Sequence, residues 1–262
     1  MAKGSRGGQR AGGTTSGSGN IQPTATPQAQ QAQQPQVDDT QQAQAMSAQY
    51  DAFMQMSDDQ KADIIDNMIK QGVPSHLADN DFQKMIYNIG LNDKPQLVDD
   101  ATLNSMNGTE LWRTVNNVYD QQNDISYTAD QIARQVQAGR VTRVSDNGGS
   151  VYGRGIYFAN DKTESTYYGN TRGNVKKTAQ IRCKLNSNAN IIRYDKARSG
   201  VSSEISKGTK LGKVLQKCDR ASQASIYAMA KGYNIIQDDR GVGYYNILNR
   251  NAVTMSKTIS AI

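Results

Sequence analysis

A glycine-flanked turn that runs directly into a short apolar strand constrains this chain more than any other feature. Gly153 and Gly155 enclose one arginine, and the strand-like run Ile156–Phe158 follows without a gap. Glycines at alternate positions allow positive φ angles or a close approach of the backbone to a ligand. The polar stretch 160–168, rich in hydroxyl groups and tyrosine, comes next. The pattern predicts a turn, a strand and aromatic rings that could stack on a flat ligand.

The first 45 residues differ from the rest in composition, because they consist mainly of Gly, Ser, Thr, Gln, Pro and Ala. Such residues bury too little apolar surface to offset the ordering cost of about 1–2 kcal/mol per residue. We therefore expect a disordered tail over residues 1–45. Its few basic residues fit either a solubilising tail or a weak contact with nucleic acid or an acidic surface.

Residues 46–106 are expected to form a small helical leader. Ser57 with Gln60 three residues later is a capping box at the start of one helix, which should stop near Gly72. A second helical pattern begins near Phe82 and ends at Gly90. These helices should pack against the domain that follows.

Residues 107–262 are expected to form a mostly β domain with two inserted helices, so the fold class is α+β. One helix should start at the capping box of Thr128 and Gln131. The second is expected over 221–231, with a glycine as its stop. The strands are expected over 110–115, 156–158, 179–185, 189–194, 233–237 and 244–248.

Composition excludes several classes of function. The net charge is +6, but the basic residues are scattered, so nucleic acid is not an expected partner. No apolar run reaches the 18 or more residues of a membrane span, so no membrane partner is expected. Cys183 and Cys218 lie far from each other and from His76, the single histidine, so we expect no metal site. Both cysteines fit ordinary core positions.

The segment Gly153–Ala159 resembles the Gly-x-Gly-Ile-Tyr-Phe-Ala motif of poly(ADP-ribose)-polymerase-like ADP-ribosyltransferases. A looser resemblance to that superfamily, which includes the diphtheria-toxin-like enzymes, extends over residues 107–255. It implies a split-β ADP-ribosyltransferase-like core after the leader and the disordered tail. It also implies NAD as a substrate, with no metal.

The resemblance implies roles for five residues in this region. Tyr157 would form a wall of the nicotinamide pocket, with Phe158 and Ala159 beside it. Continuing without a gap, Ser165 falls on the serine that holds the nicotinamide amide, and Tyr168 on the tyrosine that stacks on the ring. Aromatic faces attract a cationic pyridinium by about 0.5–2 kcal/mol. The alternative is a buried strand tyrosine and a tyrosine on a helix face.

A second match lies at Arg113 and Thr114, which resemble the arginine motif of one branch of the superfamily. Arg113 would anchor a phosphate or ribose of NAD, a task that suits its planar fork of donors. Thr114 stands where the family usually has glycine, whose backbone holds the nicotinamide amide. Without the glycine motif, Arg113 reads as a surface arginine whose stem packs on Trp112.

The catalytic glutamate of the superfamily has no counterpart here, because its position falls near Gly243. Asp238 and Asp239 are the nearest acids, and Asp239 is our candidate stand-in. Glu204 is a further acid that could fold over the site from a loop. Both aspartates also fit plain turn residues.

The function that this resemblance implies is mono-ADP-ribosylation of a protein acceptor with release of nicotinamide. A Gly/Gln-rich tail ahead of such a domain resembles proteins encoded by bacteriophages. A viral transferase would act on a host protein in the host cytoplasm, and the virion could carry it. The alternative is a non-catalytic virion or host-binding protein that keeps the fold. A secreted toxin is a third possibility, but no signal peptide is evident.

Overall fold

The computed structural model describes residues 50–74, 77–90, 94–121, 123–139, 151–170, 178–238, 240 and 243–262, with the side chains of 168–170 excepted. The predicted disordered tail and His76 therefore lie outside the described residues. The described residues belong to one compact unit that spans residues 38–262.

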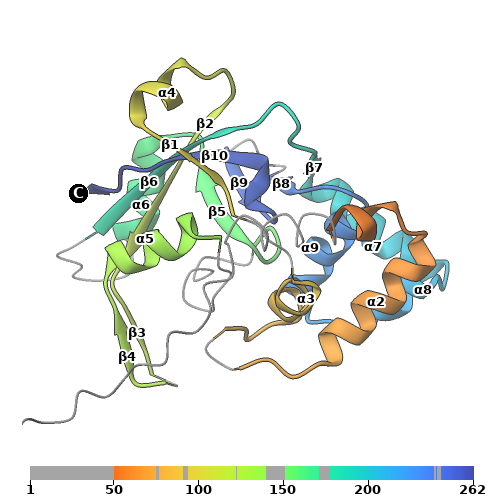
Figure 1. Ribbon diagram of the computed structural model, residues 1–262. Helices are drawn as coiled ribbons and strands as arrows, with labels where there is room; N and C mark the ends of the chain where they lie inside the picture. The colour runs from red at the N-terminus through yellow and green to blue at the C-terminus, as the bar shows by residue number, and fades with distance from the viewer. Residues whose placement is uncertain are drawn as a thin grey trace, which may run out of the picture. The chain divides into compact units, whose positions relative to one another are not determined.

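A nine-stranded sheet is the central element of this unit (Figure 1). Along the sheet the strands follow the order β1-β10-β6-β2-β5-β9-β8-β7, and β11 pairs with β6. The β1/β10 and β7/β8 pairs are parallel, and the other pairs are antiparallel. The strand bounds are β1 Gln96–Val98, β2 Glu110–Asn116, β5 Ile156–Ala159, β6 Thr178–Leu185, β7 Ile191–Arg193, β8 Ile235–Gln237, β9 Tyr244–Ile247, β10 Val253–Ser256 and β11 Ser260–Ala261.

Helices and one separate hairpin complete the described chain, which therefore mixes helices and strands as expected. The hairpin consists of β3 (Val118–Asp120) and β4 (Ile125–Tyr127). Residues 50–55 are also helical. The helix bounds are α2 Asp58–Lys70, α3 Asp81–Ile89, α4 Asp100–Ser105, α5 Ala129–Gln137, α6 Lys162–Asn170, α7 Tyr194–Ser206, α8 Lys210–Lys217, α9 Arg220–Ala230 and the 3-10 helix η1 Arg250–Ala252.

The residues predicted to start and end helices do so in the structure. Both capping boxes form: Ser57 exchanges hydrogen bonds with Gln60 at the start of α2, and Thr128 does so with Gln131 at the start of α5. Gly90 ends α3 in the left-handed conformation at φ 67°.

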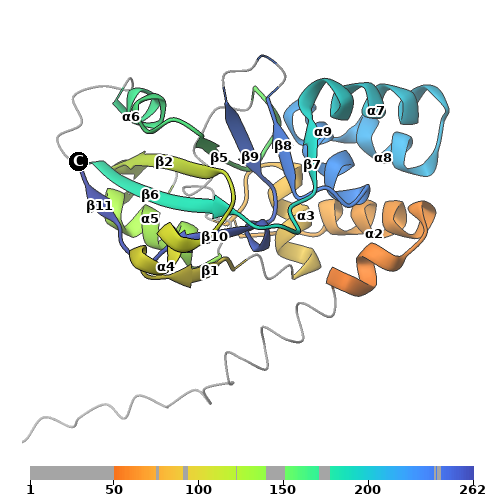
Figure 2. The same cartoon turned by 90° about the horizontal axis from the view of Figure 1, so that it is seen from above.

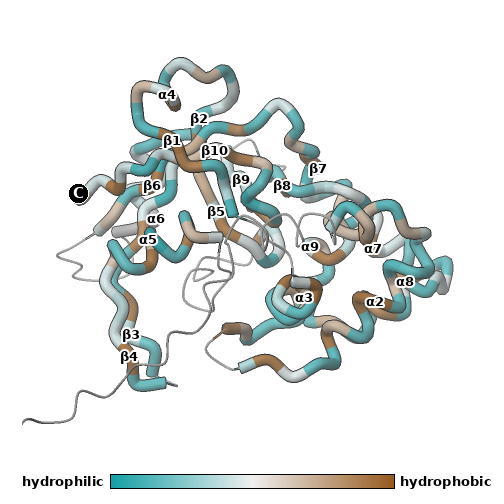
Figure 3. Tube along the Cα trace, in the orientation of Figure 1, coloured by the Kyte–Doolittle hydropathy of each residue, from teal (hydrophilic) through white to brown (hydrophobic). Residues whose placement is uncertain are grey.

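Two hydrophobic cores flank the sheet. One lies among α2, α3, α7, α8 and α9 and reaches the sheet at Ile192 and Ile236. The other lies between the sheet and α5, where Leu111, Ile181 and Ile132 are almost fully buried. Figure 3 shows hydrophobic segments along α3 and β5, at these two cores.

The leader is built into the domain. Within residues 46–106, β1 pairs with β10 and α2 packs on α8. Ion pairs also join α2 to α8 and α9, between Asp63 and Lys210 at 3.0 Å and between Asp58 and Lys231 at 2.5 Å. Such exposed pairs contribute little, so buried apolar contacts hold this junction.

The expectation of a mostly β domain with two inserted helices is wrong, because α6, α7 and α8 also lie within it. Helix α7 buries only Ala197 and Val201 and has no side-chain cap, so its apolar pattern is weak. Helix α8 carried a clearer signal: Thr209 caps it, and Leu211 and Leu215 lie on one face.

The sheet splits between β2 and β5. These strands pair at one position, Trp112 with Ala159, whereas β2 pairs with β6 along its whole length. Beyond Trp112, β2 therefore follows β6 while β5 follows β9. Figure 2 shows α6 on one side of these strands and α5 on the other. We call the side that α6 covers, with Trp112, Thr114 and Tyr157, the α6 face.

Candidate functional site

Two hydroxyl groups meet on the α6 face. The Thr114 Oγ1 atom of β2 lies 3.1 Å from the Ser165 Oγ atom of α6, although 51 positions separate them in the sequence. Ser165 is buried, and Thr114 is half-buried. A hydroxyl both donates and accepts, so this pair offers complementary partners to a carboxamide, which carries one donor group and one acceptor.

Gln180 of β6 supports this pair. Its Nε2 atom donates to Thr114 Oγ1 at 3.3 Å and to Thr166 Oγ1 at 3.5 Å. The side chain is 3 % exposed. Because Gln180 lies opposite Thr114 in the β2/β6 register, it fixes the threonine hydroxyl from the neighbouring strand. Sequence reasoning missed Gln180, since nothing in its local pattern set it apart.

Arg113 bridges the split. Its Nη1 atom donates to the backbone oxygen of Tyr157 at 2.9 Å, and the side chain is 7 % exposed. By strand alternation Arg113 lies on the α5 side of β2 with Leu111 and Val115. It is therefore a buried arginine at the split, and the surface reading on Trp112 is wrong.

Tyr157 lies on the α6 face and folds back on the glycine turn. Its hydroxyl donates to the Gly153 oxygen at 2.6 Å and accepts from the Tyr152 amide at 2.9 Å. The rings of Tyr152 and Tyr157 are 6.4 Å apart. Tyr152 also contacts the rings of Tyr194 and Tyr244, at 5.3 Å and 6.4 Å. A cluster of tyrosine rings thus borders β5 and β9.

The two glycines of the motif adopt the positive φ angles expected, +94° at Gly153 and +146° at Gly155. Their close contacts are with protein groups. A Cβ atom at Gly155 would lie 2.1 Å from Asn246 Oδ1, and one at Gly153 would lie 2.6 Å from Ser225 Oγ. Asn246 also donates to the backbone oxygens of Tyr152 and Arg154 at 3.1 Å, so the glycines let the turn pack on β9 and α9.

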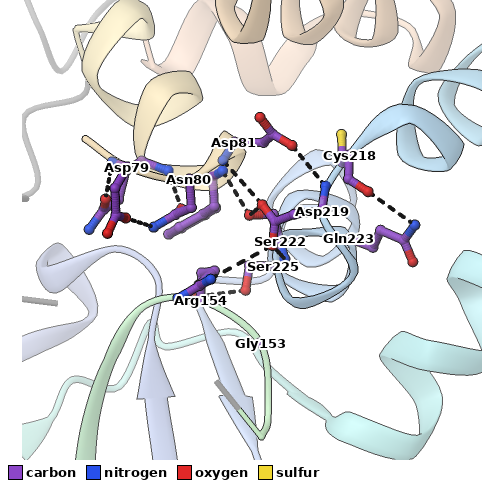
Figure 4. Close-up of polar contacts among 12 residues, drawn as sticks. Asp79, Asn80, Asp81, Gly153, Arg154, Cys218, Asp219, Ser222, Gln223 and Ser225 are labelled. Atoms are coloured by element: carbon purple, nitrogen blue, oxygen red, sulfur yellow. Dashed lines mark hydrogen bonds and ion pairs between the residues drawn. The ribbon is translucent and has the colours of Figure 1, made fainter. Parts of the chain in front are cut away.

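Arg154, which the sequence left unassigned, ties this turn to two helix N-termini (Figure 4). Its Nε atom lies 3.8 Å from Asp219 Oδ1, and its backbone oxygen accepts from Ser225 Oγ at 2.6 Å. Asp219 caps α9 and accepts from the Asp81 amide of α3 at 3.2 Å. Burial raises the pKa of Asp219, but hydrogen bonds from Ser222 and from backbone amides outweigh it and leave the pKa lowered. This polar cluster positions the turn.

Trp112, the only tryptophan of the chain, also lies on the α6 face. Lys162 Nζ is 5.3 Å from its ring centroid and Arg182 Cζ is 5.8 Å from it, so both cations lie within cation–π range. The ring is half-buried beside Thr114 and α6, and its fluorescence can report on a ligand bound there.

The remaining residues of the glycine motif are placed as follows. Phe158 is 1 % exposed and lies in the core on the α5 side, and Ala159 is buried at the split. Tyr168 is in α6, but its side chain lies outside the described residues.

Asp238 closes the turn between β8 and β9. Its carboxylate accepts from the Arg240 amide at 2.8 Å and from the Tyr244 amide at 2.7 Å, and it is 5 % exposed. These contacts are those of a turn residue. Asp239, the candidate stand-in for the glutamate, lies outside the described residues. Gly243 has φ +83°, and a Cβ atom there would lie 2.0 Å from Asn160 Oδ1.

Glu204 does not fold over the site from a loop. It belongs to α7, where it accepts from Thr209 Oγ1 at 2.6 Å and pairs with Lys231 at 3.0 Å. The hydrogen bond from Thr209 is the main cause that lowers its pKa. Glu204 therefore links α7 to the start of α8 and the end of α9.

A different carboxylate reaches the α6 face. Glu164 precedes Ser165 in α6 and accepts a hydrogen bond from the Tyr244 hydroxyl of β9. Sequence reasoning missed it, although it lies within the polar stretch that follows the motif. Its signal was its place directly before the serine.

Cys183 and Cys218 are buried free thiols, which confirms their reading as core residues. Burial is the main cause that raises the pKa of both, to about 12 for Cys218. Among the described residues, no group of three His, Cys, Asp or Glu side chains could hold a metal ion. None of the helices in the described ranges is both long and apolar enough to span a membrane.

The chain was compared with protein-family models, with curated proteins and with solved structures. None of the three comparisons found a match.

Proposed function

We propose that the α6 face binds NAD and that the protein transfers ADP-ribose from NAD to a protein acceptor, releasing nicotinamide. The observation that carries this proposal is the Thr114–Ser165 hydroxyl pair at 3.1 Å. The resemblance assigns the Ser165 hydroxyl and the Thr114 backbone to the nicotinamide amide, and these two residues meet, through their side chains, although they lie far apart in the sequence. No helical or strand periodicity requires that meeting.

Two further features support the proposal. The strands β2 and β5 diverge after Trp112 and Ala159, as a split-β core implies. By strand alternation, Tyr157 lies on the same face of the sheet as the hydroxyl pair. A tyrosine face attracts the positive charge of a nicotinamide ring. The residues of this face thus fit an amide and a flat cation.

The proposed reaction uses positioning and electrostatics. Thr114 and Ser165 would hold the amide and so orient the ring, while Tyr157 would border it. Orientation of this kind lowers the barrier by avoiding the loss of freedom during the reaction. Arg113 lies on the α5 side of β2, so in place of the NAD anchor that the resemblance implies it would keep the two halves of the sheet in register, through its bond to the Tyr157 oxygen.

A second candidate is a non-catalytic binding protein, and one observation favours it. Gly243, at the family's glutamate position, has φ +83°, and a Cβ atom there would lie 2.0 Å from Asn160 Oδ1. A position directly before β9 whose positive φ angle disfavours residues other than glycine fits a chain that binds without catalysis. The two candidates differ in whether nicotinamide is released.

Two measurements test the proposal. In the first, NAD is added to the protein while Trp112 fluorescence is followed, which gives the dissociation constant. In the second, labelled NAD is incubated with the protein and a bacterial lysate, and label transferred to proteins is counted. Ser165→Ala should weaken NAD binding about fivefold, since one hydrogen bond contributes about 1 kcal/mol. Ser199→Ala, which removes an exposed hydroxyl on α7, is the matched control and should bind NAD as the wild type does. Equal binding by both variants, or no response to NAD, would overturn the proposal. Binding without nicotinamide release would favour the second candidate.

A further inference from the structure

Glu164 is held in a defined orientation at the start of α6. Its amide donates to Asp161 Oδ1 at 2.8 Å, and the Ser165 amide donates to the Asp161 backbone oxygen at 3.1 Å. The Glu164 carboxylate accepts from the Tyr244 hydroxyl, and the side chain is half-buried. The backbone and the side chain of this residue are therefore both fixed.

Helix α6 connects the two halves of the split sheet through consecutive residues. Glu164 contacts Tyr244 on the β5/β9 half, whereas Ser165 contacts Thr114 on the β2/β6 half. Tyr244 pairs with Ala159, and Ala159 pairs with Trp112 at the position where the halves diverge. The carboxylate and the hydroxyl pair thus lie over the same split.

Other described acids near β5 and β9 are already used by the backbone or by helix ends. Asp161 accepts from the first turn of α6, and Asp238 accepts from two amides of the β8/β9 turn. Asp219 caps α9 beside Arg154. The partner that holds Glu164 is a neutral side-chain hydroxyl. A ribose hydroxyl could replace that hydroxyl without leaving a backbone group unpaired.

We propose that Glu164 supplies the carboxylate of the site, in place of the glutamate missing at Gly243. This inference rests on the proposed function. Glu164 would accept a hydrogen bond from a ribose hydroxyl of NAD and stabilise positive charge on the ribose. The bond between the ribose carbon and the nicotinamide nitrogen breaks, and its electron pair leaves with neutral nicotinamide. The ribose carbon then bonds to an acceptor heteroatom, whose proton passes to solvent.

Tyr244 is a positioning residue in this scheme. Its hydroxyl orients the Glu164 carboxylate before the ligand binds, and a pre-oriented charge needs no rearrangement during the reaction. Tyr244→Phe should therefore reduce nicotinamide release less than removal of the carboxylate does.

The test separates NAD binding from nicotinamide release in the full chain. Glu164→Gln should bind NAD within about twofold of the wild type, measured by Trp112 fluorescence, and should release nicotinamide about 100-fold more slowly. Tyr244→Phe should slow release about tenfold. Glu110→Gln is the matched control. Glu110 lies on β2, its carboxylate pairs with Arg182 of β6, and the variant should keep the wild-type rate of nicotinamide release.

Each outcome bears on the inference. If the wild type releases nicotinamide and Glu164→Gln does so at the same rate, the role of Glu164 is overturned while the proposed function stands. If the wild type releases none, the proposed function fails and the role of Glu164 fails with it. Should Glu164→Gln unfold, Glu164→Asp provides the second variant, because its shorter side chain cannot reach the same position. A wild-type rate in Glu164→Asp would also contradict the inference.

Discussion

The Arg113 guanidinium donates to the backbone oxygen of Tyr157 at 2.9 Å, across the split between β2 and β5. The two strands pair only at Trp112 and Ala159, so this oxygen receives an arginine donor in the gap beyond that pair. A side chain from one half of the sheet thus fixes the backbone of the other.

Arg113→Ala should lower the free energy of unfolding by about 1–3 kcal/mol, because it leaves a buried carbonyl without this donor. Urea unfolding followed by circular dichroism measures the change. Arg193→Ala is the control: its exposed pair with Asp195 should contribute no more than about 1 kcal/mol. Equal, small changes in both variants would mean that the Arg113 bond does not stabilise the split.

Gly155→Ala should destabilise the protein by at least about 1–3 kcal/mol, the cost of strained backbone alone. The added Cβ atom would also lie 2.1 Å from Asn246 Oδ1. Gly72→Ala provides the contrast, because no atom lies within 4 Å of its Cβ position. That variant should change stability by less than about 1 kcal/mol. Thermal melts measure both variants. If the melt of Gly155→Ala coincided with that of the wild type, the packing account of the motif would be wrong.

Asp238→Ala should destabilise the β8/β9 turn by about 1–3 kcal/mol, because two backbone amides lose their acceptor. Asp238→Asn keeps one carbonyl oxygen and should lose less. Hydrogen exchange at the Arg240 and Tyr244 amides measures the effect locally. Protection at both amides that persists in Asp238→Ala would show that the carboxylate is not their partner.

Stability should fall in acid, in part through Asp219. Its folded pKa is lowered from 3.8, since hydrogen bonds from Ser222 and backbone amides outweigh the opposing effect of burial. A lowered folded pKa stabilises the fold above pH 3.8, and this contribution is lost as pH falls through the folded value. The urea midpoint of the wild type should therefore drop between pH 5 and pH 2, and that of Asp219→Asn should drop less. If the urea midpoints of the wild type and of Asp219→Asn fell equally with pH, Asp219 would not contribute to the loss of stability in acid.

Local signals predicted the elements well where capping residues and apolar spacing agreed. The capping boxes of α2 and α5 and the alternation in β2 and β6 are set by residues a few positions apart. Helix α7 escaped prediction because it buries few apolar residues, and β1 because three residues carry too little pattern.

The candidate site was harder to predict, because its contacts cross the sheet. The resemblance pointed to Thr114 and Ser165, but Gln180 comes to Thr114 through the β2/β6 register alone. Glu164 comes to Tyr244 because α6 lies over the split, which no local pattern specifies. Arg154 likewise finds Asp219 through the packing of the turn on α9.

Two NAD samples, one labelled in the adenylate and one in the nicotinamide ring, test the central claim most directly. Each is incubated with the wild-type protein and a bacterial lysate, and protein-bound and free label are counted. The account predicts adenylate label on discrete protein bands and nicotinamide label free in solution, in equal amounts. Nicotinamide label that stays in intact NAD, with no adenylate label on protein, would contradict it.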